Sequence, residues 1–130
     1  YASSGVSEGF HNASHHSNER RNMEQFALIN PFHATLIARF LAKLQNTPDG
    51  EHDMLHNSMV LYGSSMSDAN EHNFDPLPII LAGNAGGRLQ GNRHLLFTQG
   101  TPMSNLLLGM LHKLDVPADK IGDSTEPLAI

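Results

Sequence analysis

The most regular hydrophobic pattern in the chain lies just after Pro31. Apolar residues recur there at intervals of three or four positions, which is the period of an amphipathic helix. They are Phe32, Leu36, Ile37, Phe40, Leu41 and Leu44. Asn30 and Pro31 have the chemistry of an N-cap and a first helical position, and residues 47–50 predict a turn that ends the helix near Asn46. One face of this helix is expected to be buried, with Phe32, Leu36, Phe40 and Leu44 in it.

Two shorter apolar runs follow this helix and predict strands. Residues 58–63 and 77–83 are mostly apolar, too short for helices, and typical of buried strands. Pro78 should lie at the start of the second strand, where its missing N–H is tolerated. Residues 83–91 are rich in glycine and predict a turn or an open loop, and residues 93–98 predict a third strand.

Helical spacing also occurs nearer to both ends. Met23, Phe26 and Ala27 predict one or two helical turns within residues 20–29. Residues 104–114 predict a helix whose apolar face is formed by Leu106, Leu107, Met110, Leu111 and Leu114. Residues 1–18 lack apolar periodicity and predict a loop, and the tail after Pro117 is expected to be irregular.

The order of these elements indicates an α/β fold. Strands as apolar as these usually lie inside a sheet that helices cover on both faces. We therefore expect residues 1–130 to be a single segment of a larger α/β domain that is incomplete alone. A missing N-terminal region of the same protein, or another subunit, would complete its sheet. Because no export signal follows Tyr1, the chain is expected to be a mature or truncated product.

Composition and charge narrow the classes of partner. The 39% hydrophobic and 16% charged residues are typical of a globular chain, and no apolar run reaches the roughly 18–20 residues that a membrane helix needs. The net charge is −5 and the eight Lys and Arg residues are scattered, so nucleic acid is not an expected partner. There is no cysteine, so any metal must be bound by His, carboxylate or amide groups.

The chain has nine histidines, and one group of them lies at 11, 15 and 16. His11, His15 and His16 belong to a predicted loop just before a helix. Neutral imidazole is the commonest side-chain ligand for zinc, and histidines close together in a loop can converge on one ion. The alternative is a solvated polar loop or a segment that caps the helix.

A second polar group follows the predicted strand that ends near Tyr62. Asp68 and His72, with Asn70, Glu71 and Asn73 beside them, offer oxygen and nitrogen ligands within six residues. Loops at the C-terminal ends of strands are where α/β sheets bind ligands. A mixed Asp and His set suits zinc, manganese or iron better than calcium. The alternative is a turn in which Asp and Asn side chains bind their own backbone.

Placement suggests that the two polar groups share a site. One precedes the main helix and the other follows the strand after it, and a helix that returns across a sheet brings such ends together. His15 or His16 is therefore expected to approach Asp68 and His72. His52 has no such placement, so loss of Asp68 should lower metal occupancy more than loss of His52.

Other motifs exclude some kinds of chemistry. Gly83-Asn-Ala-Gly-Gly87 lacks the spacing of a dinucleotide-binding loop and is not followed by a helix, so its glycines more simply allow a sharp turn. His33 and His112 lie in predicted helices and are expected to pack or to cap. No nucleophile motif such as Gly-x-Ser-x-Gly is present, and the catalytic residues are unknown.

Longer motifs carry a resemblance to a known family. From Ser58 the chain reads SMVLYGSSMSDANEHNFDPLPIILAGNAGGRL, and GNRHLLF, TPMSNLLLGMLHKLDVP and IGDST follow in that order. Upstream lie SHHSN, NPFHATLIARFLAKL and TPDG. Together these motifs resemble the C-terminal third of the bacterial family catalogued as domain of unknown function 1552. The resemblance implies a longer protein with an N-terminal export signal and a periplasmic or extracellular location.

That family is distantly similar to the alkaline phosphatase and sulfatase superfamily, whose α/β fold carries one or two metal ions at strand C-termini. The resemblance implies the C-terminal part of an alkaline-phosphatase-like sheet with flanking helices. His15 or His16 would match a metal-ligand loop, and Asp68 with His72 a later Asp-His ligand pair. That pair is adjacent in the superfamily, whereas three residues separate Asp68 from His72. The superfamily's nucleophile lies N-terminal to all of these motifs.

Two functions of different class follow from these observations. The first is a metal-dependent hydrolase of phosphate or sulfate esters, with its nucleophile supplied from upstream. The second is a non-catalytic envelope or extracellular subunit that keeps the fold and uses its loops for contact. Fold alone does not decide between them.

Overall fold

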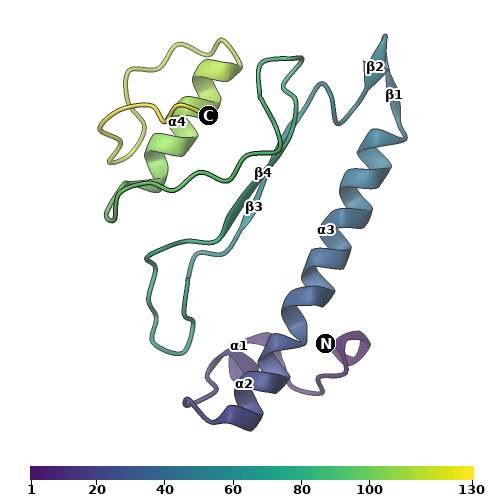
Figure 1. The fold of residues 1–130 in the computed structure, drawn as a ribbon, viewed down its shortest axis with the longest axis vertical. Helices are drawn as coiled ribbons and strands as arrows, with labels where there is room; N and C mark the ends of the chain where they lie inside the picture. The colour runs from purple at the N-terminus through teal and green to yellow at the C-terminus, as the bar shows by residue number, and fades with distance from the viewer. The chain divides into compact units, whose positions relative to one another are not determined.

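The computed structural model describes residues 1–130, with a short 3-10 helix, four α-helices and four strands (Figure 1). In chain order they are η1 (Ala2–Ser4), α1 (Phe10–Ser14), α2 (Arg20–Ala27), α3 (Ile29–Gln45), β1 (Pro48–Asp49), β2 (His52–Asp53), β3 (Met59–Gly63), β4 (Ile79–Gly83) and α4 (Met103–Lys113). The chain forms two compact units. The first unit is Tyr1–Lys43 with Tyr62–Ile79, and the second is Leu44–Leu61 with Ile80–Ile130.

The core of the first unit is small. Ile29, Val6 and Ala13 are buried together, and Phe26 of α2 packs partly against them. The ring of Phe10 lies 5.7 Å from that of Phe26, so α1 and α2 are joined through aromatic contact as well as through this core. Burial of Ile29 at the first position of α3 fixes where the long helix begins.

The N-terminal segment is more regular than its sequence predicts. The prediction of a loop over residues 1–18 is wrong where η1 and α1 form. These elements span three and five residues, too few for a hydrophobic period to be visible. The ordered N-terminal segment instead makes contacts with residues farther along the chain. The ring of Tyr1, for example, packs against the rings of Phe32 and His33.

Helix α3 has the predicted length but not the predicted burial. It ends at Gln45, and Pro31 lies in its first turn, where proline is tolerated. Leu36 is 46% exposed and Phe40 is 47% exposed, so the prediction that the apolar face is buried is wrong for these two residues. The hydrophobic period of a helix shows which residues form its apolar face. It does not show whether another part of the protein covers that face.

Two strand pairs replace the expected interior sheet. β1 and β2 form an antiparallel hairpin in which Pro48 pairs with Asp53 and Asp49 with His52. Two residues of the predicted turn therefore lie in a strand, and the chain turns at Gly50 and Glu51. β3 and β4 form the other pair. Gly63 lies against Pro78 and Gly83 lies against Ser58, so these strands also run antiparallel. The chain is a small mixed α/β structure, as predicted in class, and within residues 1–130 its strands form two antiparallel pairs.

The segment 93–98 is not a strand. It has no regular structure and every residue in it is exposed, including Leu96 at 87%. A strand needs a neighbour for its backbone hydrogen bonds, and an apolar run alone does not provide one. The prediction of a third strand is therefore wrong for this structure.

The glycine-rich segment after β4 turns sharply, as expected. Gly83, Gly86 and Gly87 have φ values of +100°, +65° and +91°, in the region that favours glycine. The backbone carbonyl of Asn84 accepts hydrogen bonds from the N–H groups of Gly87 and Leu89 in this turn. The turn therefore ends β4 directly after Gly83.

Helix α4 buries only part of the predicted apolar face, together with residues outside it. Leu106 and Leu108 are buried with Asn105 and Gly109, whereas Leu114 is 48% exposed. The reason is the C-terminal tail, because the Leu128 N–H donates to the Asn105 carbonyl at 3.0 Å and the Leu128 carbonyl lies against Gly109. Close approach of a backbone, which only a glycine permits, selects the buried face here. No helix in the structure is both long and apolar enough to span a membrane.

A charged hydrogen bond joins the start of α4 to the tail. The Ser104 hydroxyl donates to the Asp123 carboxylate, and this bond lowers the pKa of Asp123 below its usual 3.8. A carboxylate with a depressed pKa stabilises the fold above its unfolded pKa, and that contribution is lost as pH falls through the folded value. We expect Ser104→Ala to raise the pKa of Asp123 toward 3.8, as measured by NMR titration of its carboxyl carbon. An unchanged pKa would assign the shift to the backbone bond of Asp123 or to Lys120 instead.

Candidate metal site in the first unit

His15 lies at the point where α1 ends. It is the C-cap of α1, and its N–H donates to the Asn12 carbonyl. His11, four residues earlier on α1, has its ring 4.7 Å from the His15 ring. Residues four apart on a helix share a face, so this spacing places both imidazoles on one side of the short helix. His11 is exposed and His15 is half-buried, so solvent reaches the pair.

The loop between β3 and β4 supplies the second group. Asp68 and Asn73 form an isolated antiparallel bridge, which closes a tight loop over the residues between them. The Asp68 Oδ1 accepts the N–H groups of Asn70 and Glu71 at 2.9 and 3.3 Å. The alternative of a self-satisfied Asp turn is therefore correct for this oxygen, while ligation of a metal by Asp68 stays a prediction. His72 has φ +54°, an uncommon value for a residue that is not glycine.

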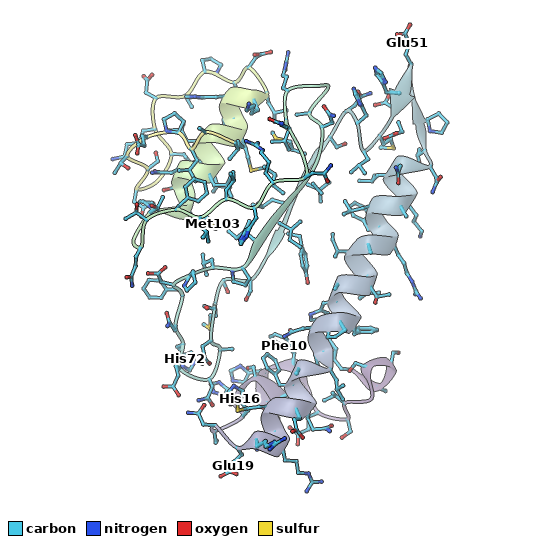
Figure 2. All side chains as sticks on the ribbon, in the orientation of Figure 1. Phe10, His16, Glu19, Glu51, His72 and Met103 are labelled. Carbon is cyan, nitrogen blue, oxygen red and sulfur yellow. The ribbon has the colours of Figure 1, made fainter.

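The structure brings His15 and His72 together. Their ring centroids are 5.0 Å apart although the two residues are far apart in sequence. Two imidazoles bound to one tetrahedral zinc at about 2.0–2.1 Å would have ring centroids about 5 Å apart. The pair thus has the spacing of two ligands of one ion. In Figure 2 the loop that carries His72 reaches the part of the first unit where His16 is labelled.

His16 has a different environment from its neighbour. It is only 8% exposed, its Nδ1 accepts the Asn18 N–H at 3.2 Å, and its ring centroid lies 6.1 Å from that of Phe26. These contacts hold His16 within the first unit as a packed histidine whose Nδ1 is occupied. Of the two adjacent histidines, it is His15 whose ring lies against that of His72.

The two loops are also joined by polar contacts. The Ser17 N–H donates to Asn70 Oδ1 at 2.8 Å. Glu71 Oε1 accepts from Asn18 Nδ2 at 3.2 Å and from Asn70 Nδ2 at 2.8 Å. The sequence identifies Asn70 and Glu71 as side chains of ligand type, but it gives no sign that they bind the other loop. Such a pairing depends on long-range folding and has no local signal.

The charge of this region favours a cation. The loop at 64–75 contains Asp68, Glu71 and Asp75 and no Lys or Arg. A loop whose charged side chains are all negative raises the local concentration of divalent cations. No group of three or more His, Asp or Glu side chains is arranged to hold a metal ion. The candidate site therefore consists of the imidazole pair.

The remaining histidines have other surroundings. His33 packs against the rings of Tyr1 and Phe10, and His112 Nε2 lies 2.8 Å from the Ala118 carbonyl oxygen, so both have the packing or capping contacts expected of them. His52 and His56 stack with centroids 3.8 Å apart and planes 22° apart. This second imidazole pair belongs to the β1–β2 region of the second unit.

Comparisons with models of protein families, with curated proteins and with solved structures find no match to this chain. The geometry of the two loops and the chemistry of their side chains are therefore the features of the chain that indicate a function. The imidazole pair of His15 and His72 is the first of these features.

Proposed function

We propose that His15 and His72 hold a divalent metal ion and that the protein is an exported bacterial metal-dependent hydrolase of phosphate or sulfate esters. The spacing of 5.0 Å between the two rings is the observation that supports this proposal. Imidazole ligands favour zinc, and the carboxylates of the 64–75 loop also suit manganese or iron. Asp68 has a second carboxylate oxygen to offer, and His11 lies against His15.

The chemistry that such an ion supplies is polarisation of an ester oxygen and activation of a nucleophile. The chain's own residues bind and orient the ion, with the short helix α1 and the closed 68–73 loop as supports. The nucleophile would come from a part of the protein outside residues 1–130. The SHHSN and SDANEH motifs resemble the bacterial family catalogued as domain of unknown function 1552, and the distant similarity of that family to the alkaline phosphatase and sulfatase superfamily supports the choice of reaction. The resemblance to the bacterial family also implies the periplasmic or extracellular location.

The proposal is tested by zinc titration of the 130-residue chain. We expect His15→Ala and His72→Ala each to weaken zinc binding by at least about tenfold, because loss of one of few ligands removes roughly 1.4 kcal/mol or more of binding energy. Isothermal titration calorimetry measures the affinity and the stoichiometry. His52→Ala is the matched control, because His52 belongs to the other imidazole pair and should leave the affinity unchanged.

Two results would contradict this proposal. Zinc binding that falls with His52→Ala and persists with His72→Ala would place the ion on the stacked pair of the second unit. Absence of stoichiometric zinc, manganese or iron binding by the unmodified chain would remove the metal site altogether.

A second candidate is a non-catalytic envelope or extracellular subunit, and the exposed apolar residues favour it. Phe74 is 73% exposed, and Leu36, Phe40 and Leu96 are exposed as well. Leu36 and Phe40 lie four residues apart on α3 and therefore share a face, and an exposed apolar face of this kind is typical of a contact site, which would receive the N-terminal region of the same protein or another subunit. Metal content separates the two candidates, since the subunit has no need of a stoichiometric ion.

A further inference from the structure

We infer that Asn70 is a positioning residue that sets the approach of His72 to His15, an inference that rests on the proposed metal function. Asn70 lies two residues before His72 and binds the backbone two residues after His15. It therefore connects the two loops at equal distance along the chain from each imidazole. The hydrogen bonds that join the two loops are made by Ser17, Asn18, Asn70 and Glu71, and neither histidine takes part in them.

The contacts of Asn70 use both ends of its amide. Oδ1 accepts the Ser17 N–H at 2.8 Å, and Nδ2 donates to Glu71 Oε1 at 2.8 Å. The same Glu71 oxygen accepts from Asn18 Nδ2, so the bridge has two arms that meet at Glu71. The backbone N–H of Asn70 is held by Asp68 Oδ1. The Asn70 side chain is thus fixed at both polar atoms and at the backbone.

The backbone on both sides of this bridge is in an uncommon conformation. Ser17, Asn18 and His72 have φ values of +52°, +57° and +54°, although none is a glycine. Left-handed backbone at such residues costs free energy and persists only where surrounding contacts hold it. Asn70 and Glu71 supply contacts of this kind between the loops. The bridge therefore maintains the two turns that present His15 and His72.

Residues that orient metal ligands without touching the metal have a measurable effect on affinity. Loss of such a residue commonly weakens metal binding by about 10- to 100-fold. We expect Asn70→Ala to weaken zinc binding by this amount in the 130-residue chain. Asn73→Ala is the control, because the Asn73 side chain binds only the Asp75 N–H within its own loop.

A swapped pair tests whether the bridge itself is responsible. In the double variant Asn70→Asp with Glu71→Gln, a carboxylate can still accept the Ser17 N–H, and the new glutamine amide can donate to that carboxylate. The net charge of the pair is unchanged. We expect this double variant to recover most of the zinc affinity that Asn70→Ala loses.

A measurement without metal separates this inference from the proposed function. The ring protons of His15 and His72 should show a nuclear Overhauser effect in the metal-free chain, since their ring centroids are 5.0 Å apart. Asn70→Ala should abolish that signal, whereas Asn73→Ala and the swapped pair should retain it. If the unmodified chain shows the signal but binds no zinc, the proposed function fails and the positioning role stands.

Two outcomes overturn the positioning role. One is that Asn70→Ala keeps both the nuclear Overhauser signal and the zinc affinity while His72→Ala loses affinity. In that case the proposed metal site stands and the positioning role of Asn70 fails. The other outcome concerns the case in which Asn70→Ala unfolds the first unit. The double variant Asn70→Asp with Glu71→Gln then tests the positioning role in place of Asn70→Ala. A folded swapped pair without the His15–His72 signal would show that the bridge does not set the approach of the two rings.

Discussion

Replacing Gly83 by alanine is expected to destabilise the second unit by about 3–5 kcal/mol. Gly83 has φ +100°, a conformation that side chains rarely adopt. A Cβ atom at this position would overlap the Ser58 carbonyl oxygen and would lie 3.0 Å from the Leu55 carbonyl oxygen. Both obstacles are backbone atoms, so no side chain can rotate to relieve the overlap. Either β4 must move away from the 55–58 segment or the turn after it must change.

Gly86→Ala provides the matched comparison for this prediction. Gly86 has φ +65°, but no atom lies within 4 Å of where its Cβ would be. Only the backbone conformation opposes the substitution, and the expected cost is about 1 kcal/mol. Urea denaturation measures both variants, and amide hydrogen exchange of Ala85 and Gly86, whose N–H groups donate to Ser58 and His56, localises the change. Equal destabilisation by the two substitutions would show that the contact with Ser58 does not matter.

The longer elements of this fold, α3, β3 and β4 among them, were predictable because each has its own local pattern. The helical period after Pro31 and the apolar runs at β3 and β4 depend on neighbours within a few residues. The pairing of the strands depends on partners far along the chain. An apolar strand can lie inside a parallel sheet or in an antiparallel pair, so the sequence did not exclude the arrangement that β3 and β4 adopt.

The candidate site shows the same division. The rings of His15 and His72 lie 5.0 Å apart, as their placement predicted, whereas the expected approach of these histidines to Asp68 stays a prediction. The expected cause, strand ends meeting at one edge of a covered sheet, is wrong, because the loop of an antiparallel pair carries His72 instead. The choice of His15 over His16 could not be predicted. Adjacent residues differ only in the direction of their side chains, and that direction is set by core packing around Phe26.

The burial of α4 could be predicted only in part, for a related reason. The apolar period of the helix includes Leu106 on the buried side and also Leu114, which is 48% exposed. Two non-hydrophobic residues, Asn105 and Gly109, decide which side receives the tail. Hydrophobic periodicity gives such residues no weight, although Asn105 is more deeply buried than most of the leucines of α4.

Loss of the Asn105 side chain is therefore expected to release the C-terminal tail from α4. Asn105 is 2% exposed, its Oδ1 accepts the Thr125 N–H at 2.8 Å, and its Nδ2 donates to Thr125 Oγ1 at 3.1 Å. Asn105→Ala removes both bonds and leaves the Thr125 N–H without its partner. The expected cost is about 2–3 kcal/mol, because an unpaired donor in a partly buried position loses its bond without full compensation by water.

Thr125→Val separates the two bonds that Asn105 makes. Valine keeps the backbone N–H that binds Asn105 Oδ1 and removes only the hydroxyl that accepts from Nδ2. Because the buried Nδ2 then lacks that acceptor while the other bond remains, a cost of about 1–2 kcal/mol is expected. Urea denaturation gives the two free energies of unfolding, and amide exchange at Thr125 and Leu128 reports release of the tail. A larger effect is expected at Thr125 in Asn105→Ala, because the lost bond is its own. If Thr125→Val were as damaging as Asn105→Ala, the hydroxyl rather than the backbone bond would hold the tail on α4.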